Sequence, residues 1–296
     1  MNVLSLFDGI SCGQVALNKA LREREIRYFS SEIKKYAIQV TQKNFPNTIQ
    51  LGDVKEIDFK QFEGKIDLLI AGSPCQDLSL PNKKREGLKG KKSSLFWYFA
   101  KALEEVKPKY FFLENVPMPK EDYEKISRTL GTYPIEINSK LVSAQLRRRL
   151  YWFNWGRKNY DILGFPTCDI PQPQDKKISL QSILEHGYTN REKQIALMRK
   201  SYLIYPSDPI KRDIYVRKRM KNFPSPIVYE SPDCNIESWR FHTQIELERL
   251  QTLPDGYTDC IDFMKASDCI GDGWTVDVIA HIFSFLFDEI EKNEKK

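Results

Sequence analysis

The chain has 296 residues, of which 41% are hydrophobic and 29% charged, values typical of soluble globular proteins, so a disordered or fibrous protein is excluded. This length allows one large domain, alone or with a small one. The apolar runs are far shorter than the roughly 20 residues that span a bilayer. Because the first residues carry no basic leader, we expect a cytoplasmic protein without a signal peptide.

The cysteine content and the distribution of charge further limit the functions that the chain can have. The six cysteines show no Cys-x-x-Cys spacing and there are only three histidines, which predicts reduced thiols and no metal site. The formal charge of +6 is concentrated in two stretches, Lys83–Lys92 and Arg191–Lys221. A polyanion is therefore a candidate partner. Two solvated loops explain the same charges equally well.

The first half of the chain alternates short apolar runs with amphipathic segments. Buried parallel strands are predicted at Val3–Phe7, Tyr28–Ser31, Ile66–Ala71 and Tyr110–Leu113, and a further strand at Arg149–Trp155. Helical patterns follow Gly13 and Ser93 or Ser94. This alternation of strands and helices predicts a doubly wound α/β sheet.

The second half of the chain shows no sustained alternation of strands and helices. Prolines punctuate the segment from Phe165 to about Arg240, where we expect a separate small domain. Helical periodicity returns at Ile245–Leu250 and is strong from Val276 to Leu286, which predicts a final helix that packs on the sheet. The charged tail from Glu289 onward is expected to fray.

A glycine-containing turn, Phe7–Gly13, joins the first strand to the first helix. Such turns bring backbone N–H groups close to a cofactor at the carboxyl edge of a sheet. The full Gly-x-Gly-x-x-Gly pattern of dinucleotide sites is missing, and a turn needed only for folding explains the segment equally well. Glu32, at the end of the second strand, is placed to accept hydrogen bonds from ribose hydroxyls, and Asp53 follows at the third.

Two reactive side chains follow neighbouring strands. Cys75 comes directly after Pro74, on the loop behind the strand Ile66–Ala71, where an exposed thiol near helix termini favours the thiolate. Glu114 brings a carboxylate to the same edge from the next strand. In the segment Gln145–Arg149, alternate basic side chains point to one face of the following strand. A basic strand end that forms salt bridges at the surface explains this pattern as well.

The order of these segments resembles that of the DNA cytosine-5 methyltransferases over nearly the whole chain. The shared motifs are Phe-x-Gly, Pro-Cys-Gln, Glu-Asn-Val, Gln-x-Arg-x-Arg, Arg249-Leu250-Gln251 and Gly271-x-Gly273. The details around Cys75 and Trp274 look closest to the animal de novo branch. Without room for the chromatin-reading domains of that branch, a bacterial or phage enzyme is expected.

The resemblance implies an S-adenosylmethionine-dependent methyltransferase with a Rossmann-like catalytic domain at residues 1–164 and 241–296 and a target-recognition domain at 165–240. It implies methyl transfer to carbon 5 of a flipped-out cytosine in duplex DNA. Cys75 would add to carbon 6, and Glu114 would hold the exocyclic amine and ring nitrogen 3. Arg147 and Arg149 would hold the ring oxygen and a phosphate.

The resemblance also implies contacts with cofactor and DNA. The cofactor contacts would be Phe7, Asp8, Gly9, Ile10, Glu32, Asp53, Val54, Pro74, Trp274 and Val276. The DNA contacts would be Gln76, Ser79, Lys83, Lys84, Arg85 and Gln145. Partners would be double-stranded DNA and a cognate restriction endonuclease acting on the same site, in the cytoplasm of a bacterial or phage-infected cell.

The chain departs from the family pattern at one motif. It reads Gly271-Asp272-Gly273-Trp274 where bacterial relatives usually have Gly-Asn, so we assign the cofactor contact to Trp274 and none to Asp272. Two alternatives stay open. An RNA methyltransferase on the same core would carry a Cys-Phe-Thr motif, which is missing, and a catalytically silent DNA-binding relative would lack Cys75 or Glu114.

Overall fold

The computed structural model describes the chain apart from residues 21–24, 73–94, 161–163, 198–206, 221–226 and 295–296. The chain divides into two compact units. The first consists of Met1–Asn138, Arg148–Gln172 and Ile279–Lys296, and the second of Ser139–Arg147 and Pro173–Val278. Each unit is therefore assembled from segments that are separated in the sequence.

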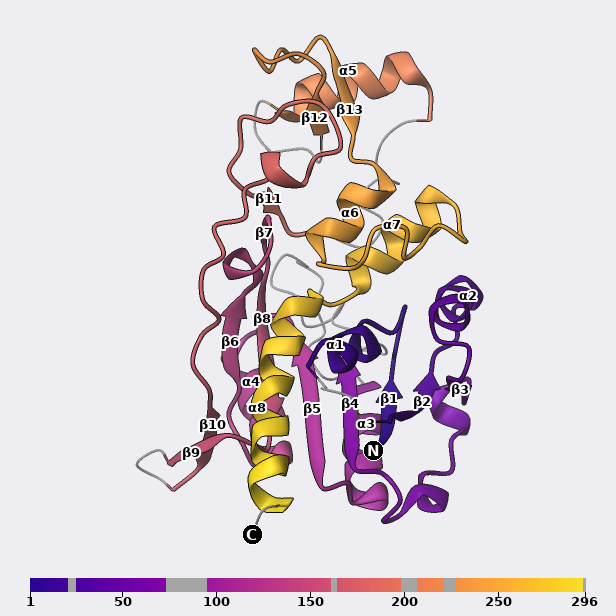
Figure 1. The fold of residues 1–296 in the computed structure, drawn as a ribbon, viewed down its shortest axis with the longest axis vertical. Coiled ribbons are helices and arrows are strands. Elements are labelled where there is room, and N and C mark those ends of the chain that lie inside the picture. The colour runs from indigo at the N-terminus through magenta and orange to yellow at the C-terminus, as the bar shows by residue number, and fades with distance from the viewer. Residues whose placement is uncertain (21–24, 73–94, 161–163, 198–206, 221–226, 295–296) are drawn as a thin grey trace. The chain divides into compact units, whose positions relative to one another are not determined.

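A seven-stranded sheet in the order β3-β2-β1-β4-β5-β8-β6 organises the first unit (Figure 1). The strands are β1 (Asn2–Leu6), β2 (Arg27–Ser31), β3 (Ile49–Gln50), β4 (Leu68–Gly72), β5 (Tyr110–Asn115), β6 (Ile135–Asn138) and β8 (Arg148–Phe153). Pairs among β1 to β5 are parallel, whereas β8 runs antiparallel to both β5 and β6. The predicted doubly wound α/β sheet is confirmed, and its strand order reverses between β1 and β4.

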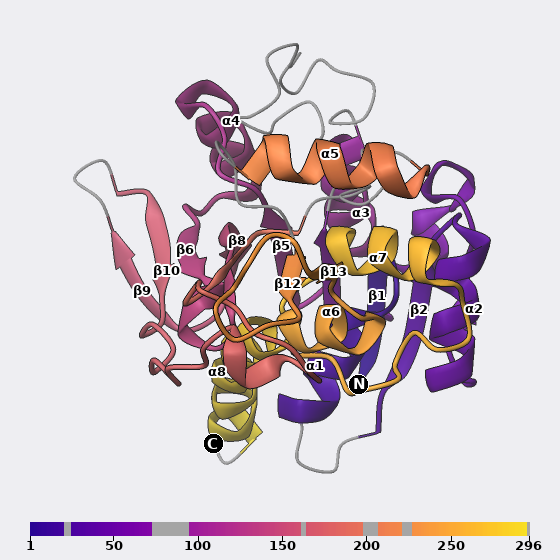
Figure 2. The ribbon, with the colours of Figure 1, turned by 90° about the horizontal axis from the view of Figure 1, so that it is seen from above.

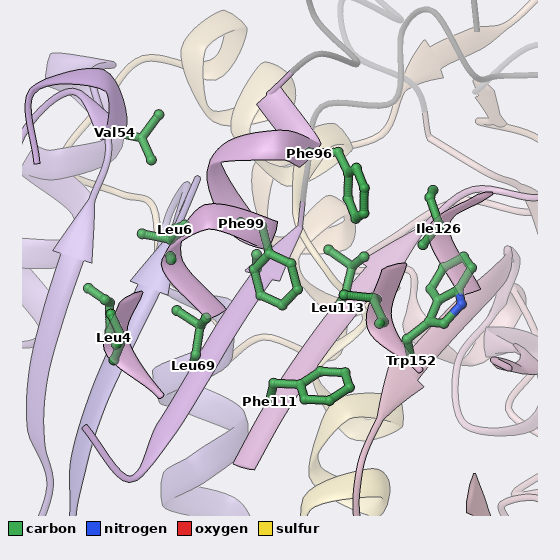
Figure 3. Packing of buried hydrophobic residues seen from close by; sticks show 14 of the residues in the cluster. Leu4, Leu6, Val54, Leu69, Phe96, Phe99, Phe111, Leu113, Ile126 and Trp152 are labelled. Atoms are coloured by element: carbon green, nitrogen blue, oxygen red, sulfur yellow. The ribbon is translucent and has the colours of Figure 1, made fainter. Parts of the chain in front are cut away.

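One face of the sheet packs against α3 (Phe96–Val106) and α4 (Lys120–Leu130). Alternate residues of the strands, such as Leu4 and Leu113, point into this layer, which also contains Phe99 of α3 (Figure 3). Trp152 is fully buried there, and its indole Nε1 donates to Ser127 Oγ at 3.0 Å. The central strands are apolar on both sides because both faces of the sheet are covered.

The opposite face is covered by α1 (Cys12–Ala20) and α8 (Val276–Glu294) (Figures 1 and 2). The ring of Phe283 on α8 lies 5.3 Å from that of Phe112 and 6.1 Å from that of Trp155. Trp155 Nε1 donates to the carbonyl of Ile282 at 3.1 Å. The predicted packing of the final helix on the sheet is thereby confirmed.

The charged end of the chain differs from expectation, since α8 continues to Glu294 and the prediction that the tail frays from Glu289 is wrong. Glu289 Oε2 accepts the backbone N–H of Gly156 at 2.9 Å, which anchors this turn of the helix to the sheet. No single helix in the described part of the chain is long and apolar enough to cross a membrane. The bent pair of α7 (Phe263–Asp272) and α8 reaches that length and apolar composition only when the two helices are taken together.

The second unit contains small elements. They are η5 (Ser139–Leu141), β7 (Gln145–Leu146), η6 (Gln181–Ile183), β11 (Gln194–Ile195), α5 (Pro209–Met220), β12 (Ile227–Tyr229), β13 (Trp239–Phe241), α6 (Gln244–Leu250) and α7 (Phe263–Asp272). The remaining elements belong to the first unit: α2 (Lys35–Asn44), η1 (Val54–Glu56), η2 (Phe59–Phe62), β9 (Arg157–Tyr160) and β10 (Pro166–Asp169). The second unit thus contains residues 173–240 of the predicted segment 165–240, lacks residues 165–172, and adds Ser139–Arg147 and residues 241–278.

Candidate active site

The carboxyl ends of β1, β2, β4 and β5 lie at one edge of the sheet because these strands are parallel. In the register of β4 and β5, Gly72 pairs with Glu114. The antiparallel strand β8 reaches the same edge with its first residues, since Asn115 pairs with Leu150. Residues that follow the parallel strands, and residues that begin β8, therefore share one edge.

The turn after β1 holds a strained backbone. Phe7 has φ of 58° and Gly9 has φ of 61°, both in the left-handed region. A bulky residue such as Phe7 rarely adopts this conformation, which costs on the order of 1–3 kcal/mol. The N–H of Asp8 donates to the carbonyl of Ser31 at 3.1 Å, which ties the turn to the end of β2. Strain held in this way is typical of ligand-binding turns.

A cluster of hydroxyl groups surrounds the half-buried carboxylate of Asp8. Ser5 Oγ donates at 2.5 Å, Tyr28 OH at 2.7 Å and Ser30 Oγ at 2.9 Å, and Ser11 Oγ donates to the same carboxylate. Desolvation by burial nevertheless raises the pKa of Asp8 above its ordinary value, against these hydrogen bonds, which lower it. The cluster fixes the turn to two strands and the start of α1.

Asp8→Asn tests this raised pKa through stability. A carboxyl with a raised pKa binds its proton more tightly in the native state, so wild-type stability falls as pH rises from 3.8 through the native pKa. The variant has no such titration. Its free energy of unfolding, relative to that of the wild type, should therefore grow as the pH rises across that window.

Urea denaturation at a series of pH values measures this difference. Ser30→Ala is the matched control, because it keeps the carboxylate and removes one stabilising hydroxyl. This control should steepen the loss of stability with pH. A difference between Asp8→Asn and wild type that does not change with pH would contradict the raised pKa.

Glu32 and Asp53 follow β2 and β3 as predicted. Glu32 Oε2 accepts the N–H of Gly9 at 2.9 Å, and Oε1 accepts those of Ile33 and Lys34 at 2.7 and 2.8 Å. Asp53 caps η1 through Oδ1, which accepts the N–H of Lys55 at 3.0 Å. Both carboxylates retain lone pairs, since each carboxylate offers about four acceptor positions.

Glu114 and Arg149 meet at the shared edge. Glu114, which ends the apolar run of β5, is 8% exposed, and the Nε atom of Arg149 lies 2.9 Å from its Oε1 atom. Arg149 comes from the beginning of β8 and also donates from Nη1 to the carbonyl of Arg148 at 2.8 Å. Sequence reasoning placed Glu114 at this edge, and the structure shows Arg149 paired with it as an ion pair.

Four predicted site residues belong to the second unit. Gln145 has no exposed area; its amide nitrogen donates to the carbonyl of Leu250, and its amide oxygen accepts the N–H of Leu197. This leaves Gln145 no surface to offer a DNA strand. Arg147 is also buried, Trp274 is half-buried, and Val276 is buried at the start of α8.

Part of the predicted site lies outside the described residues. It consists of the predicted nucleophile, one cofactor contact and five DNA contacts: Cys75, Pro74, Gln76, Ser79, Lys83, Lys84 and Arg85. The basic stretch Arg191–Lys221 is described only at residues 191–197 and 207–220.

Sequence reasoning missed the hydroxyl groups around Asp8. Ser5, Tyr28 and Ser30 are polar residues within strands that are otherwise apolar and buried. Such residues need hydrogen-bond partners, which is the signal that could have found them. Their common partner could not be read from the sequence, because the register of β1 on β2 brings them together.

The fold and the residues at this edge define the class of protein. The chain superposes on the methyltransferase EhMeth of Entamoeba histolytica over 98% of the residues of each protein, with a TM-score of 0.67. At 18% sequence identity, this similarity shows a shared fold. The expected methyltransferase fold is confirmed.

Sequence comparison gives the family. Residues 1–203 match the family model of C-5 cytosine-specific DNA methylases, and the chain belongs to that family. It is 27% identical to the type II methyltransferase M1.ScrFI of Lactococcus lactis, over 99% of this chain and 79% of that one. It is 28% identical to M.NgoBV of Neisseria gonorrhoeae over 80% of this chain, but spans only 55% of the length of that enzyme.

Proposed function

We propose that this chain methylates carbon 5 of a cytosine in duplex DNA, with Cys75 as nucleophile and with Glu114 and Arg149 holding the target ring. The observation that carries the proposal is the pair of Glu114 and Arg149 at the carboxyl edge of the sheet. Membership of the C-5 cytosine-specific DNA methylase family supports the choice of base and atom.

The chemistry requires activation, because carbon 5 of cytosine is a poor nucleophile. Addition of the Cys75 thiolate to carbon 6 makes carbon 5 electron-rich. Carbon 5 then gains the methyl group and loses its proton, and the thiolate leaves as the ring double bond re-forms. Glu114 would share a proton with ring nitrogen 3, and Arg149 would donate to the ring oxygen, so that charge on the ring is balanced at each stage.

The turn after β1 fits the methyl donor. S-Adenosylmethionine supplies an electrophilic methyl group on a sulfonium. Glu32 would accept hydrogen bonds from the ribose hydroxyls, and Asp53 with Val54 would hold the base. The remaining lone pairs of both carboxylates and the closeness of Gly9 to Glu32 support this fit. Phe7, Asp8, Ile10, Pro74, Trp274 and Val276 complete the proposed contacts.

Methyl transfer from labelled S-adenosylmethionine, followed by bisulfite sequencing of the DNA, tests the proposal. We expect methylation of cytosine at carbon 5 within one short sequence. Methylation of an exocyclic nitrogen would overturn the reaction. Methyl transfer to RNA but not to duplex DNA would favour the RNA methyltransferase. DNA binding without any methyl transfer would favour the catalytically silent relative.

The helix α5 lies within the second basic stretch, Arg191–Lys221, which is described at residues 191–197 and 207–220. Its Asp213 accepts from Arg217 Nε at 2.6 Å and from Trp239 Nε1 at 2.8 Å, which anchors the helix to β13. Its outer residues are exposed: Lys211, Lys218, and the isoleucines Ile210 and Ile214 at 74% and 61%. Exposed lysines beside apolar side chains suit contact with DNA phosphates and bases.

Replacing Lys211 and Lys218 together by Gln should weaken binding to all DNA sequences alike. If each lysine contacts one phosphate, the slope of log affinity against log salt should fall by about two. Fluorescence anisotropy over a range of salt concentrations measures this. The control is Lys60→Gln with Lys292→Gln, two exposed lysines of the first unit. If log affinity falls with log salt at the same slope in both double variants, α5 is a solvent-exposed face that does not contact DNA phosphates.

The remaining partners follow from the relatives. M1.ScrFI and M.NgoBV are both called type II methyltransferases, which supports a cognate restriction endonuclease acting on the same site. Location in the cytoplasm of a bacterial or phage-infected cell accords with a DNA substrate. DNA methylated by this chain should then resist that endonuclease, which a cleavage assay on treated and untreated DNA measures.

A further inference from the structure

Arg147, the first arginine of the Gln-x-Arg-x-Arg motif, is engaged within the second unit. It lies between β7 and β8 and is only 3% exposed. Its Nη1 donates to the carbonyl of Leu197 at 3.0 Å, and its Nη2 donates to the carbonyls of Gly271 and Gly273 at 3.3 and 2.8 Å. Two terminal nitrogens that a substrate would need are therefore committed to backbone carbonyls.

The carbonyls of Gly271 and Gly273 belong to the turn that carries Trp274. This turn connects α7 to α8, and Gln251 holds it from a second side. Gln251 Nε2 donates to the carbonyls of Ile270 and Gly273 at 2.9 and 3.3 Å. Thr275 Oγ1 donates to Gln251 Oε1 at 2.7 Å, so the turn is fixed on both sides of Trp274.

The guanidinium suits this task better than other side chains. It is planar, always charged, and presents several donors in a fixed fork. Charge-assisted hydrogen bonds are roughly twice as strong as neutral ones, and they are stronger where water is excluded. A lysine could not reach three carbonyls with the same geometry. The contacts thus give arginine a structural role at this position that involves no contact to the target base.

We infer that Arg147 is a positioning residue for the turn Gly271–Trp274, and that its effect on methylation passes through S-adenosylmethionine binding. The inference rests on the proposed cofactor contact of Trp274. It separates the two arginines of one motif: Arg149 faces Glu114 and the target base, whereas Arg147 holds the turn on which a cofactor contact depends.

Arg147→Lys is the main test, with Arg149→Lys and Arg148→Lys beside it. Arg147→Lys should raise KM for S-adenosylmethionine and its Kd by calorimetry at least about tenfold, with KM for DNA and kcat at saturation near wild type. Arg149→Lys should lower kcat at saturation instead. Arg148, exposed and paired with Glu136 at 2.7 Å, is the matched control and should change neither constant.

Two further measurements keep the inference testable if Arg147→Lys folds poorly. Thr275→Val removes a hydroxyl that holds the same turn and should produce the same selective rise in Kd. Hydrogen–deuterium exchange without S-adenosylmethionine should be faster at residues 271–276 in both variants. In the double variant with Trp274→Ala, the loss of affinity should be smaller than the product of the two single losses.

A lower kcat at saturating S-adenosylmethionine with unchanged Kd would overturn the inference, because it would place Arg147 at the target base. Additive effects with Trp274→Ala would overturn it as well. These outcomes differ from a failure of the proposed function, which would appear as wild-type protein that transfers no methyl group to carbon 5 of cytosine.

Discussion

Duplex DNA with 5-fluorocytosine at the target position is expected to trap the enzyme in a complex that withstands denaturant. If Cys75 adds to carbon 6 and carbon 5 is methylated, fluorine in place of hydrogen leaves no proton for a base to remove. The thiol therefore cannot leave, and the enzyme stays bonded to the DNA. The complex should require S-adenosylmethionine and accumulate to one enzyme per site, measured by denaturing electrophoresis.

Cys75→Ala should abolish both this complex and methyl transfer to unmodified DNA. Cys260→Ala is the control, because Cys260 is a half-buried cysteine with a reduced thiol in the described part of the chain. It should leave trapping unchanged. A complex that forms without S-adenosylmethionine, or that survives in Cys75→Ala, would exclude the proposed order of steps or the proposed nucleophile.

Glu114→Gln should lose most turnover while it still binds DNA. The amide keeps the shape of the side chain but cannot share the proton with ring nitrogen 3, and it also removes the negative charge that lies 2.9 Å from Arg149 Nε. Loss of one group that stabilises developing charge lowers kcat by about 10²–10³ in comparable sites. Single-turnover methyl transfer at saturating DNA measures this rate.

The chain offers a close control for that variant. Glu136 and Arg148 form a similar pair on β6 and β8, but both side chains are largely exposed. Exposed pairs contribute little to stability. Glu136→Gln should therefore leave both turnover and folding near wild type. Equal losses in the two variants would mean that Glu114 acts through the sheet and not on the base.

The sheet could be predicted because its strands are short, apolar and separated by helical patterns. Such runs contain Leu4, Leu69 and Leu113, which are fully buried. The strands of a parallel sheet are apolar throughout because both faces of the sheet are covered. The position of Glu114 at the sheet edge could be predicted as well, because it directly follows an apolar strand whose direction decides where its end lies. The ion pair of Glu114 with Arg149 was not predicted, because it depends on the antiparallel register of β5 and β8.

Other features depend on register and on contacts that are distant in sequence. The hydrogen bonds from Arg147 to Gly271 and Gly273 join positions more than 120 residues apart. No local sequence pattern predicts them. The hydroxyl cluster around Asp8 needs β1 and β2 in one particular register. The helical tail needed the bond from Gly156 to Glu289, which again joins distant segments.

The aromatic layer of Phe112, Trp155 and Phe283 has a consequence for how the protein is made. The ring of Phe283 and the carbonyl that Trp155 binds arrive more than 120 residues after β8. While the chain is being synthesised from the N-terminus, the part of this face that α8 covers therefore stays exposed until α8 emerges. Such delayed contacts slow folding and expose apolar surface. Nascent chains should accordingly depend on chaperones until α8 has been translated.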